Sequence, residues 1–359
     1  MRQKIGDRMD RWFDRNLSLL VKAFLNFLSK EYIVINSLCF KSIFFLVLSL
    51  NIPDLSHSDS IPSREWIDSL RVDVETMGVS TATWDEIQPF LKFDTRVKAL
   101  HKIQPEFTQD LTSYYKKRLT KSRIDYSKKM LEKHDSLLDS IEVDFNVSKE
   151  LIVSLWGLES DFGRFQGDFN IITSLTSLAA GRRARYFRRE LLEAILLYEE
   201  SNFQMENFIG SWAGAIGQCQ FMPWNARKYG IDYDQNGVVD LKNSTSDALA
   251  SMANFLRSLG WNDSYTWGRP VSLSDDIIED SLLNGQTTHS LNDWEEIGVR
   301  RMNGDSLPDV DLEARLLRPK KSGGRIYLIY PNFDVIMKWN RSHYFALTVG
   351  SLLNQIKNN

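Results

Sequence analysis

Residues 151–167, LIVSLWGLESDFGRFQG, form the segment around which the rest of the chain is organised. Its apolar residues recur at intervals of three and four positions, and this spacing predicts a helix buried on one side. Ser148 suits the N-cap of this helix, and Glu150 suits the positive end of its dipole. Gly163 predicts the end of the helix. The segment therefore reads as a core helix followed by a glycine-bearing turn.

Glu159 lies just before this predicted turn, close in sequence to Trp156 and Leu158. An apolar setting raises the pKa of a carboxyl group because it disfavours the charged form, and such an acid can donate a proton near neutral pH. The alternative is a solvated glutamate at a helix end, which is the commoner state of this residue type. The segment alone leaves both interpretations open.

A second stretch, Gly210–Pro223, reads GSWAGAIGQCQFMP. Its glycines and alanines are poor material for a helix interior and suit a backbone that approaches a ligand or a neighbouring element closely. Ser211, Gln218 and Gln220 add neutral hydrogen-bonding groups of the kind that bind sugar hydroxyls and amides. Tight packing of small residues explains the same pattern, and the two interpretations are compatible.

Five motifs follow one another along the chain: WGLESDFG, RRARYF, GSWAGAIGQCQFMP, IDYDQNGVVD and LGW. In this order they strongly resemble the B-type lytic murein transglycosylases, from roughly Trp66 to the C-terminus and most densely between Leu151 and Trp261. The resemblance implies a mainly α (α+β) fold, with a lysozyme-like helical catalytic core at about 145–262, additional helical segments and a small β-sheet. It divides the chain into an N-terminal extension at 1–63, with a signal or anchor segment and a linker, and a catalytic region at 64–359.

The resemblance also implies an enzyme that cleaves the bond between N-acetylmuramic acid and N-acetylglucosamine without water, with Glu159 as single acid and base. Asp161 is two residues away and does not share a helix face with Glu159, so no second catalytic carboxylate is evident. A hydrolytic muramidase, which would need such a carboxylate, and an inactive calcium-stabilised peptidoglycan-binding protein remain the alternatives. No cofactor is expected for the chemistry.

The substrate-binding residues are also implied by the resemblance. Three of them, all aromatic, stand where the family commonly has tyrosines, so ring stacking would remain while hydroxyl hydrogen bonds would be lost. The predicted set is Ser211, Gln220, Arg182, Arg183, Phe255, Trp339, Asn340 and Phe345.

The motif IDYDQNGVVD matches the first positions of an EF-hand loop, in which oxygen donors alternate around a sharp glycine turn. Asn243 stands at position twelve instead of glutamate. The resembled family closes its loop with a later aspartate, and Asp247 is the equivalent here. An Asx-rich turn without metal is the alternative to a structural Ca²⁺. The predicted ligands are Asp232, Asp234, Asn236, Val238, Asp240 and Asp247.

The N-terminal segment has Lys41 followed by IFFLVLSL and a serine-rich stretch, an order typical of a secretory signal. Its apolar core is shorter than the roughly 20 residues that span a bilayer. We expect export to the bacterial periplasm, with cleavage near Ser56–Ser60 or with an uncleaved anchor that associates with the membrane. Cys39 lies in this segment, so no disulfide with Cys219 is implied.

Five arginines between residues 182 and 189 raise nucleic acid as a partner. The net charge of −3 and the few interleaved aromatic residues favour a solvated helix face instead. We therefore expect peptidoglycan glycan strands as the partner, no nucleic acid, and a monomer.

The remaining pattern is mainly helical, with a polar, loop-rich lobe at Val271–Asp311. Strand-like alternation occurs at Arg325–Tyr330 and Phe333–Met337, and a final helix follows. The other predicted helices include Arg123–Ile141, Ile171–Ala180, Tyr186–Ser201 and Asp247–Trp261.

Overall fold

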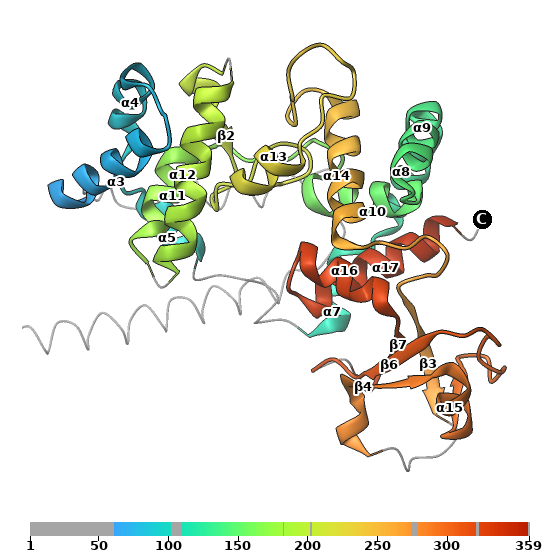
Figure 1. The fold of residues 1–359 in the computed structure, drawn as a ribbon. Helices are drawn as coiled ribbons and strands as arrows, with labels where there is room; N and C mark the ends of the chain where they lie inside the picture. Colours follow the sequence, from blue (N-terminus) through green and yellow to red (C-terminus); the bar gives the residue numbers. More distant parts are fainter. Residues whose placement is uncertain are drawn as a thin grey trace, which may run out of the picture. The chain divides into compact units, whose positions relative to one another are not determined.

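The computed structural model describes residues 61–101, 110–181, 183–201, 203–273, 279–320 and 323–357. The predicted signal or anchor segment and nearly all of the linker lie outside these residues, as does Arg182. Helices dominate the described chain, and the mainly α prediction is confirmed (Figure 1). The α-helices up to residue 200 are α3 (Arg64–Thr76), α4 (Thr81–Ile87), α5 (Thr95–His101), α7 (Leu111–Arg118), α8 (Lys121–Lys133), α9 (Asp135–Phe145), α10 (Lys149–Ser160), α11 (Ile171–Ala179) and α12 (Ala184–Glu200).

Fewer helices occur after residue 200, where a sheet interrupts them. They are α13 (Pro223–Tyr229), α14 (Thr245–Leu259), α15 (Leu291–Glu296), α16 (Pro331–Trp339) and α17 (His343–Lys357). Within the described residues, no helix is both long and apolar enough to cross a membrane.

Helix α10 is the centre of the large hydrophobic core. Every residue from Leu151 to Leu158 is buried, so the helix is covered on all sides and not on one side as the periodicity predicted. The reason is its surroundings, since α8, α9, α14 and α17 all contact it. A helix that is apolar around its whole circumference is stable only in such a position. Ser148 occupies the N-cap position as predicted, although its side chain makes no capping hydrogen bond.

The predicted helix Arg123–Ile141 is two helices. The helix is interrupted at His134, which is the C-cap of α8 and the N-cap of α9 and has φ −112° and ψ 22°. Its imidazole ring lies edge-on to the Trp156 ring, with 5.6 Å between the centroids. The break therefore fits α8 and α9 around the buried α10.

Five antiparallel strands form a sheet in the order β4–β6–β7–β3–β5. Strands β4 and β5 and the second half of β3 lie in the region expected to be loop-rich, so its described residues contain more strand than predicted. Helix α15 contacts β4 and β5, and a second, smaller core includes Trp294 and Leu316. The strands are β3 (Gly268–Leu273), β4 (Asn284–Ser290), β5 (Val299–Arg301), β6 (Glu313–Leu317) and β7 (Ile326–Ile329).

The predicted strand Phe333–Met337 is wrong, because these residues belong to α16. Pro331 occupies its first turn, where a missing backbone N–H costs nothing. Phe333 and Ile336 are buried at a spacing of three, which suits a helix. A run of five residues is too short for periodicity to separate helix from strand. The neighbouring strand prediction holds, since β7 lies within Arg325–Tyr330.

Candidate active site

Glu159 sits in the last turn of α10, just before an unusual change of backbone direction. The helix ends at Ser160, earlier than Gly163 predicted. Asp161, Phe162 and Gly163 then adopt left-handed conformations, with φ of 52°, 63° and 79°. For the two non-glycine residues this conformation costs roughly 1 kcal/mol each, so other contacts must hold it.

Two sets of contacts hold this turn. The Asp161 carboxylate lies 2.6 Å from Arg164 Nη2 and 3.5 Å from Arg123 Nη2. The Phe162 ring folds back over Gly157, where an added Cβ would lie only 2.7 Å from its Cζ atom. The motif WGLESDFG thus specifies the end of the helix, where the missing side chain of Gly157 leaves room for the Phe162 ring. The backbone course directly after Glu159 is therefore held on both sides.

The glycine-rich stretch packs directly on this helix end. Ser160 Oγ donates to the Gln218 carbonyl at 2.6 Å, and Trp156 Nε1 donates to Gln218 Oε1 at 3.0 Å. Gly217 has φ 68°, and a Cβ there would lie 2.3 Å from the Leu241 carbonyl oxygen. The small residues therefore serve close backbone packing, which is one of the two interpretations that the sequence allowed.

Ser211 and Gln220 also hold the backbone of this stretch. Ser211 Oγ accepts hydrogen bonds from the amides of Ala213 and Ala215, at 3.3 and 3.0 Å. Gln220 has φ 51°, and its Nε2 donates to the Gln166 and Gly217 carbonyls. Both side chains thus stabilise the backbone conformation of Gly210–Pro223, which we call the glycine-rich wall beside the end of α10.

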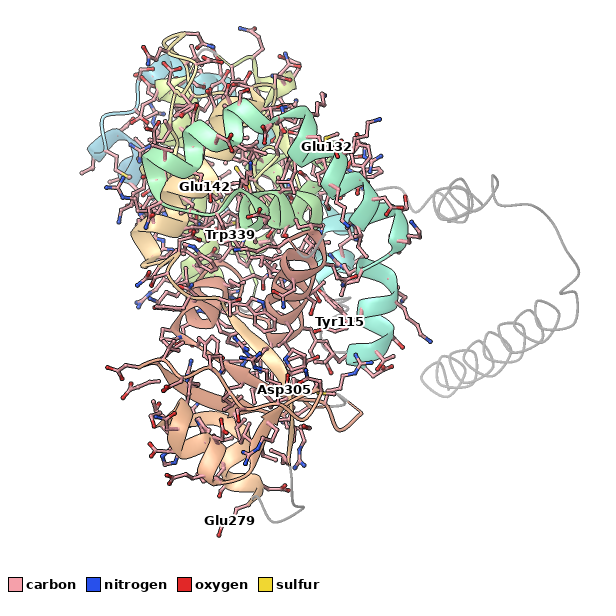
Figure 2. The ribbon with its side chains drawn as sticks, turned by 90° about the vertical axis from the view of Figure 1, so that its right-hand side faces the viewer. Tyr115, Glu132, Glu142, Glu279, Asp305 and Trp339 are labelled. Carbon is pink, nitrogen blue, oxygen red and sulfur yellow. The ribbon has the colours of Figure 1, made fainter. Side chains whose placement is uncertain are left out.

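Trp339, the last residue of α16, brings a third element to the site. Its indole Nε1 donates to Glu159 Oε1 at 2.7 Å, across 180 positions of sequence. The Trp339 ring packs on Phe221 and Phe255, with centroid distances of 5.4 and 5.3 Å. In Figure 2, Trp339 is seen between Glu142 of α9 and Asp305 of the sheet lobe. The carboxyl group is therefore set against an aromatic cluster.

A row of rings continues from this cluster, and sequence reasoning missed most of it. Phe255 lies 4.6 Å from Tyr229, and Tyr229 lies 5.8 Å from Trp224. The Arg189 guanidinium then lies over the rings of both Trp224 and Tyr186. The row reaches the Arg183 guanidinium, 4.5 Å from the Tyr186 centroid. The signal was present in the aromatic residues of PWNARKY, which directly follow the glycine-rich stretch.

The other predicted substrate-binding residues differ in their exposure. Arg183 is exposed, and Asn340 is half-buried at the end of α16. Phe255 and Phe345 are only 5% and 3% exposed, so most of each ring packs against other side chains. Their expected role in stacking stays a prediction, which this burial does not favour. The sequence could not show it, because burial of a single aromatic residue depends on the packing around it.

Cys219 is fully buried within the glycine-rich stretch, close enough to Glu159 to feel its charge. Burial raises the pKa of its thiol to about 12. The thiol is therefore neutral and unreactive at neutral pH. This agrees with a small filler without chemistry of its own.

The acidic loop, Asp232–Asp247, brings three of its predicted ligands together. Carboxylate oxygens of Asp232, Asp234 and Asp247 lie within 4.8 Å of one another. Asp247 is completely buried in the first turn of α14 and accepts from the Asp240 amide at 2.9 Å. The Asp240 carboxylate points elsewhere, since it accepts from the amides of Lys242 and Asn243. Asn236 Oδ1 accepts from the Val238 amide.

The helical core, the sheet lobe and the carboxyl group at the helix end define a lysozyme-like class of protein. Residues 62–354 match the Transglycosylase SLT domain family, so the chain belongs to that family. The predicted resemblance is confirmed. Among curated proteins, the chain is 29% identical over 247 residues to the membrane-bound lytic murein transglycosylase B of Escherichia coli (strain K12). That match spans 67% of this chain and 65% of the relative, slightly less than two thirds of its length.

Solved structures agree in fold. SltB3 from Pseudomonas aeruginosa, in complex with NAG-anhNAM-pentapeptide, is 33% identical with a TM-score of 0.77, covering 82% of this chain and 79% of that chain. SltB1 from the same organism is 26% identical with a TM-score of 0.71, covering 81% and 97%. The Escherichia coli lytic transglycosylase Slt35, in complex with calcium, is 26% identical with a TM-score of 0.69, covering 82% and 92%. The lysozyme-like fold prediction is confirmed.

Proposed function

We propose that this protein is a peptidoglycan lytic transglycosylase with Glu159 as its single acid and base. The observation that carries the proposal is the Glu159 carboxyl group, fixed by Trp339 at the end of α10 beside the glycine-rich wall. Membership of the Transglycosylase SLT domain family supports the proposal, and so does the similarity to a lytic murein transglycosylase.

The reaction follows from one carboxyl group. Protonated Glu159 gives its proton to the oxygen between N-acetylmuramic acid and N-acetylglucosamine. The bond from muramic C1 to that oxygen breaks, and its electron pair stays on the oxygen. The Glu159 carboxylate then takes the proton of the muramoyl 6-hydroxyl while O6 bonds to C1. The acid is regenerated and no water is consumed.

Two other carboxylates, Asp161 and Glu190, already have partners, which favours this scheme over a hydrolytic muramidase. Asp161 is held by two arginines. Glu190 is 1% exposed and accepts from Arg189 and from the Trp224 amide. An inverting hydrolase would need a second carboxylate that is open to water.

The test is mass spectrometry of the muropeptides that the mature protein releases from purified peptidoglycan. Ends of 1,6-anhydromuramic acid, lighter than reducing ends by one water, are expected. Reducing ends would establish the muramidase instead. Binding without any release would favour the inactive peptidoglycan-binding protein.

The substrate cleft then runs along the aromatic row towards Arg183. Arg182 and Arg183 are proposed to meet carboxylates of the peptide stem, since guanidinium groups bind carboxylates in a bidentate way. Ser211, Gln220, Trp339 and Asn340 are proposed to face the sugars near Glu159. Phe255 and Phe345 would act beneath this surface.

Ca²⁺ is proposed to bind the acidic loop in a structural role. The fit is good, since three carboxylates converge, one of them fully buried, and such a group of like charges favours a hard cation. Asp232, Asp234 and Asp247 would be the side-chain ligands, with Asn236 and the Val238 carbonyl completing the set and Asp240 acting through water.

Residues 64–359 are proposed to form the catalytic region of an exported, periplasmic monomer. The segment before it is proposed to act as a signal or membrane anchor, and a relative is named as membrane-bound. Mass spectrometry of the protein from cells tests this, because a mature N-terminus near Ser56–Ser60 indicates cleavage and an intact Met1 excludes it.

A further inference from the structure

Trp339 occupies a position from which it can control the chemistry of Glu159. The indole N–H donates to Glu159 Oε1 at 2.7 Å, a short distance that is typical of hydrogen bonds to an ionised acceptor. A tyrosine hydroxyl at such a position could donate or accept. An indole can only donate, since it has no acceptor atom.

The donor cannot easily turn away. Phe221 and Phe255 are buried, and their rings lie 5.4 Å apart at 83° to each other. Trp339 packs against both at 55° and 42°. The three rings form a triangle, and rotation of the indole would break two aromatic contacts at once. Phe221 comes from the glycine-rich stretch and Phe255 from α14, so two further elements fix the donor.

We propose that Trp339 is a positioning residue: its indole N–H keeps Glu159 Oε1 as a hydrogen-bond acceptor and so places the transferable proton on Oε2. The inference rests on the proposed role of Glu159 as acid and base. In a protonated carboxyl group the oxygen without the proton is the better acceptor, so a donor-only partner selects which oxygen carries it. The same hydrogen bond favours the carboxylate that must act as base in the second step.

Cys219 and Asp161 are two neighbours of this carboxyl group. The buried Cys219 thiol stays neutral, and Asp161, two residues on, is paired with Arg123 and Arg164.

The first test is the pH dependence of kcat and kcat/KM for Trp339→Phe on peptidoglycan fragments. We expect kcat to fall about ten- to a hundredfold, as for a lost hydrogen bond to a charged group, while KM changes little. Without the donor the pKa of Glu159 rises, so the acid stays protonated to higher pH. The alkaline limb of the kcat/KM profile therefore moves to higher pH. Trp339→Tyr should move it less, because a hydroxyl can still donate.

Trp261→Phe is the matched control. The Trp261 indole also donates to a carboxylate, Asp263 Oδ1 at 3.2 Å, and is 7% exposed. Its loss should leave the pH profile unmoved. A Trp339→Phe protein with raised KM and an unmoved alkaline limb would mean that Trp339 only stacks on a sugar, which would overturn the inference.

A second test needs no turnover. The indole N–H resonance of Trp339, assigned by its absence in Trp339→Tyr, should titrate with pH in the native protein and stay flat in Glu159→Gln. A resonance that does not titrate in the native protein overturns the inference, even if Glu159→Gln is inactive. Full turnover by Glu159→Gln would instead contradict the proposed role of Glu159 in catalysis, while the titration of the indole N–H in the native protein would still test the hydrogen bond.

Discussion

The site around Glu159 and the acidic loop both depend on carboxylates, yet they surround them in opposite ways. Glu159 is a single carboxyl group set against aromatic rings, with an indole N–H as partner. The loop instead gathers three carboxylates, which accept hydrogen bonds from backbone amides such as those of Gly237 and Tyr233.

This difference separates chemistry from binding. An apolar setting favours proton exchange by a carboxyl group at moderate pH, whereas several converging carboxylates favour binding of a hard cation. The two proposals therefore give the same chemical group, a carboxyl, two purposes according to the groups packed around it.

The largest expected effect is on turnover. Glu159→Gln should lower kcat by about 10²–10⁴-fold, the usual contribution of a general acid and base, with glycan binding retained. Its melting temperature should match that of the native protein, since the amide keeps the size of the side chain. Turnover within tenfold of the native value would contradict the role of Glu159.

Replacement of Asp247 in the acidic loop should instead lower the stability of the protein. Asp247→Ala leaves the amides of Tyr233, Asp234 and Asp240 without their acceptor, so the free energy of unfolding should fall by about 3 kcal/mol. Thermal unfolding with and without chelator measures it. Asp68→Ala, which removes an exposed carboxylate 3.9 Å from Arg64, is the control, and an equal loss there would contradict the special place of Asp247.

Calcium itself should stabilise the native protein and the Glu159→Gln variant alike. At a hundred times its dissociation constant, a ligand that binds only the folded state adds about 2.7 kcal/mol. Calorimetry with Ca²⁺ should show this rise, and Asp247→Ala should lose it. An identical melting temperature in Ca²⁺ and in chelator would remove the metal proposal and leave an Asx-rich turn.

A smaller effect on turnover is expected at the left-handed turn Asp161–Gly163, which directly follows Glu159 and Ser160. Asp161→Asn weakens the pairs with Arg123 and Arg164, and kcat should fall less than tenfold because Phe162 still holds the turn. Steady-state kinetics measures this. Asp125→Asn removes an exposed pair with Lys121 and should change nothing. A loss beyond a hundredfold for Asp161→Asn would place Asp161 in the chemistry itself.

Some features were readable from local pattern alone. The helix at α10 and the left-handed glycine that ends α14 at Gly260 follow from spacing and from glycine conformation. The convergence of Asp232, Asp234 and Asp247 was also predicted, because loop ligands are close in sequence.

What the tertiary structure alone decided was the hydrogen bond between Trp339 and Glu159. Trp339 lies 180 positions away on a helix that the sequence predicted as a strand, and its indole reaches the carboxyl group because Phe221 and Phe255 fix it there. The sequence by itself determined which residues have the chemistry, since side-chain type and short-range spacing are local properties. Burial and long-range contact are set by the whole core, and they determined that Phe255 and Phe345 are buried while the Trp339 indole reaches Glu159.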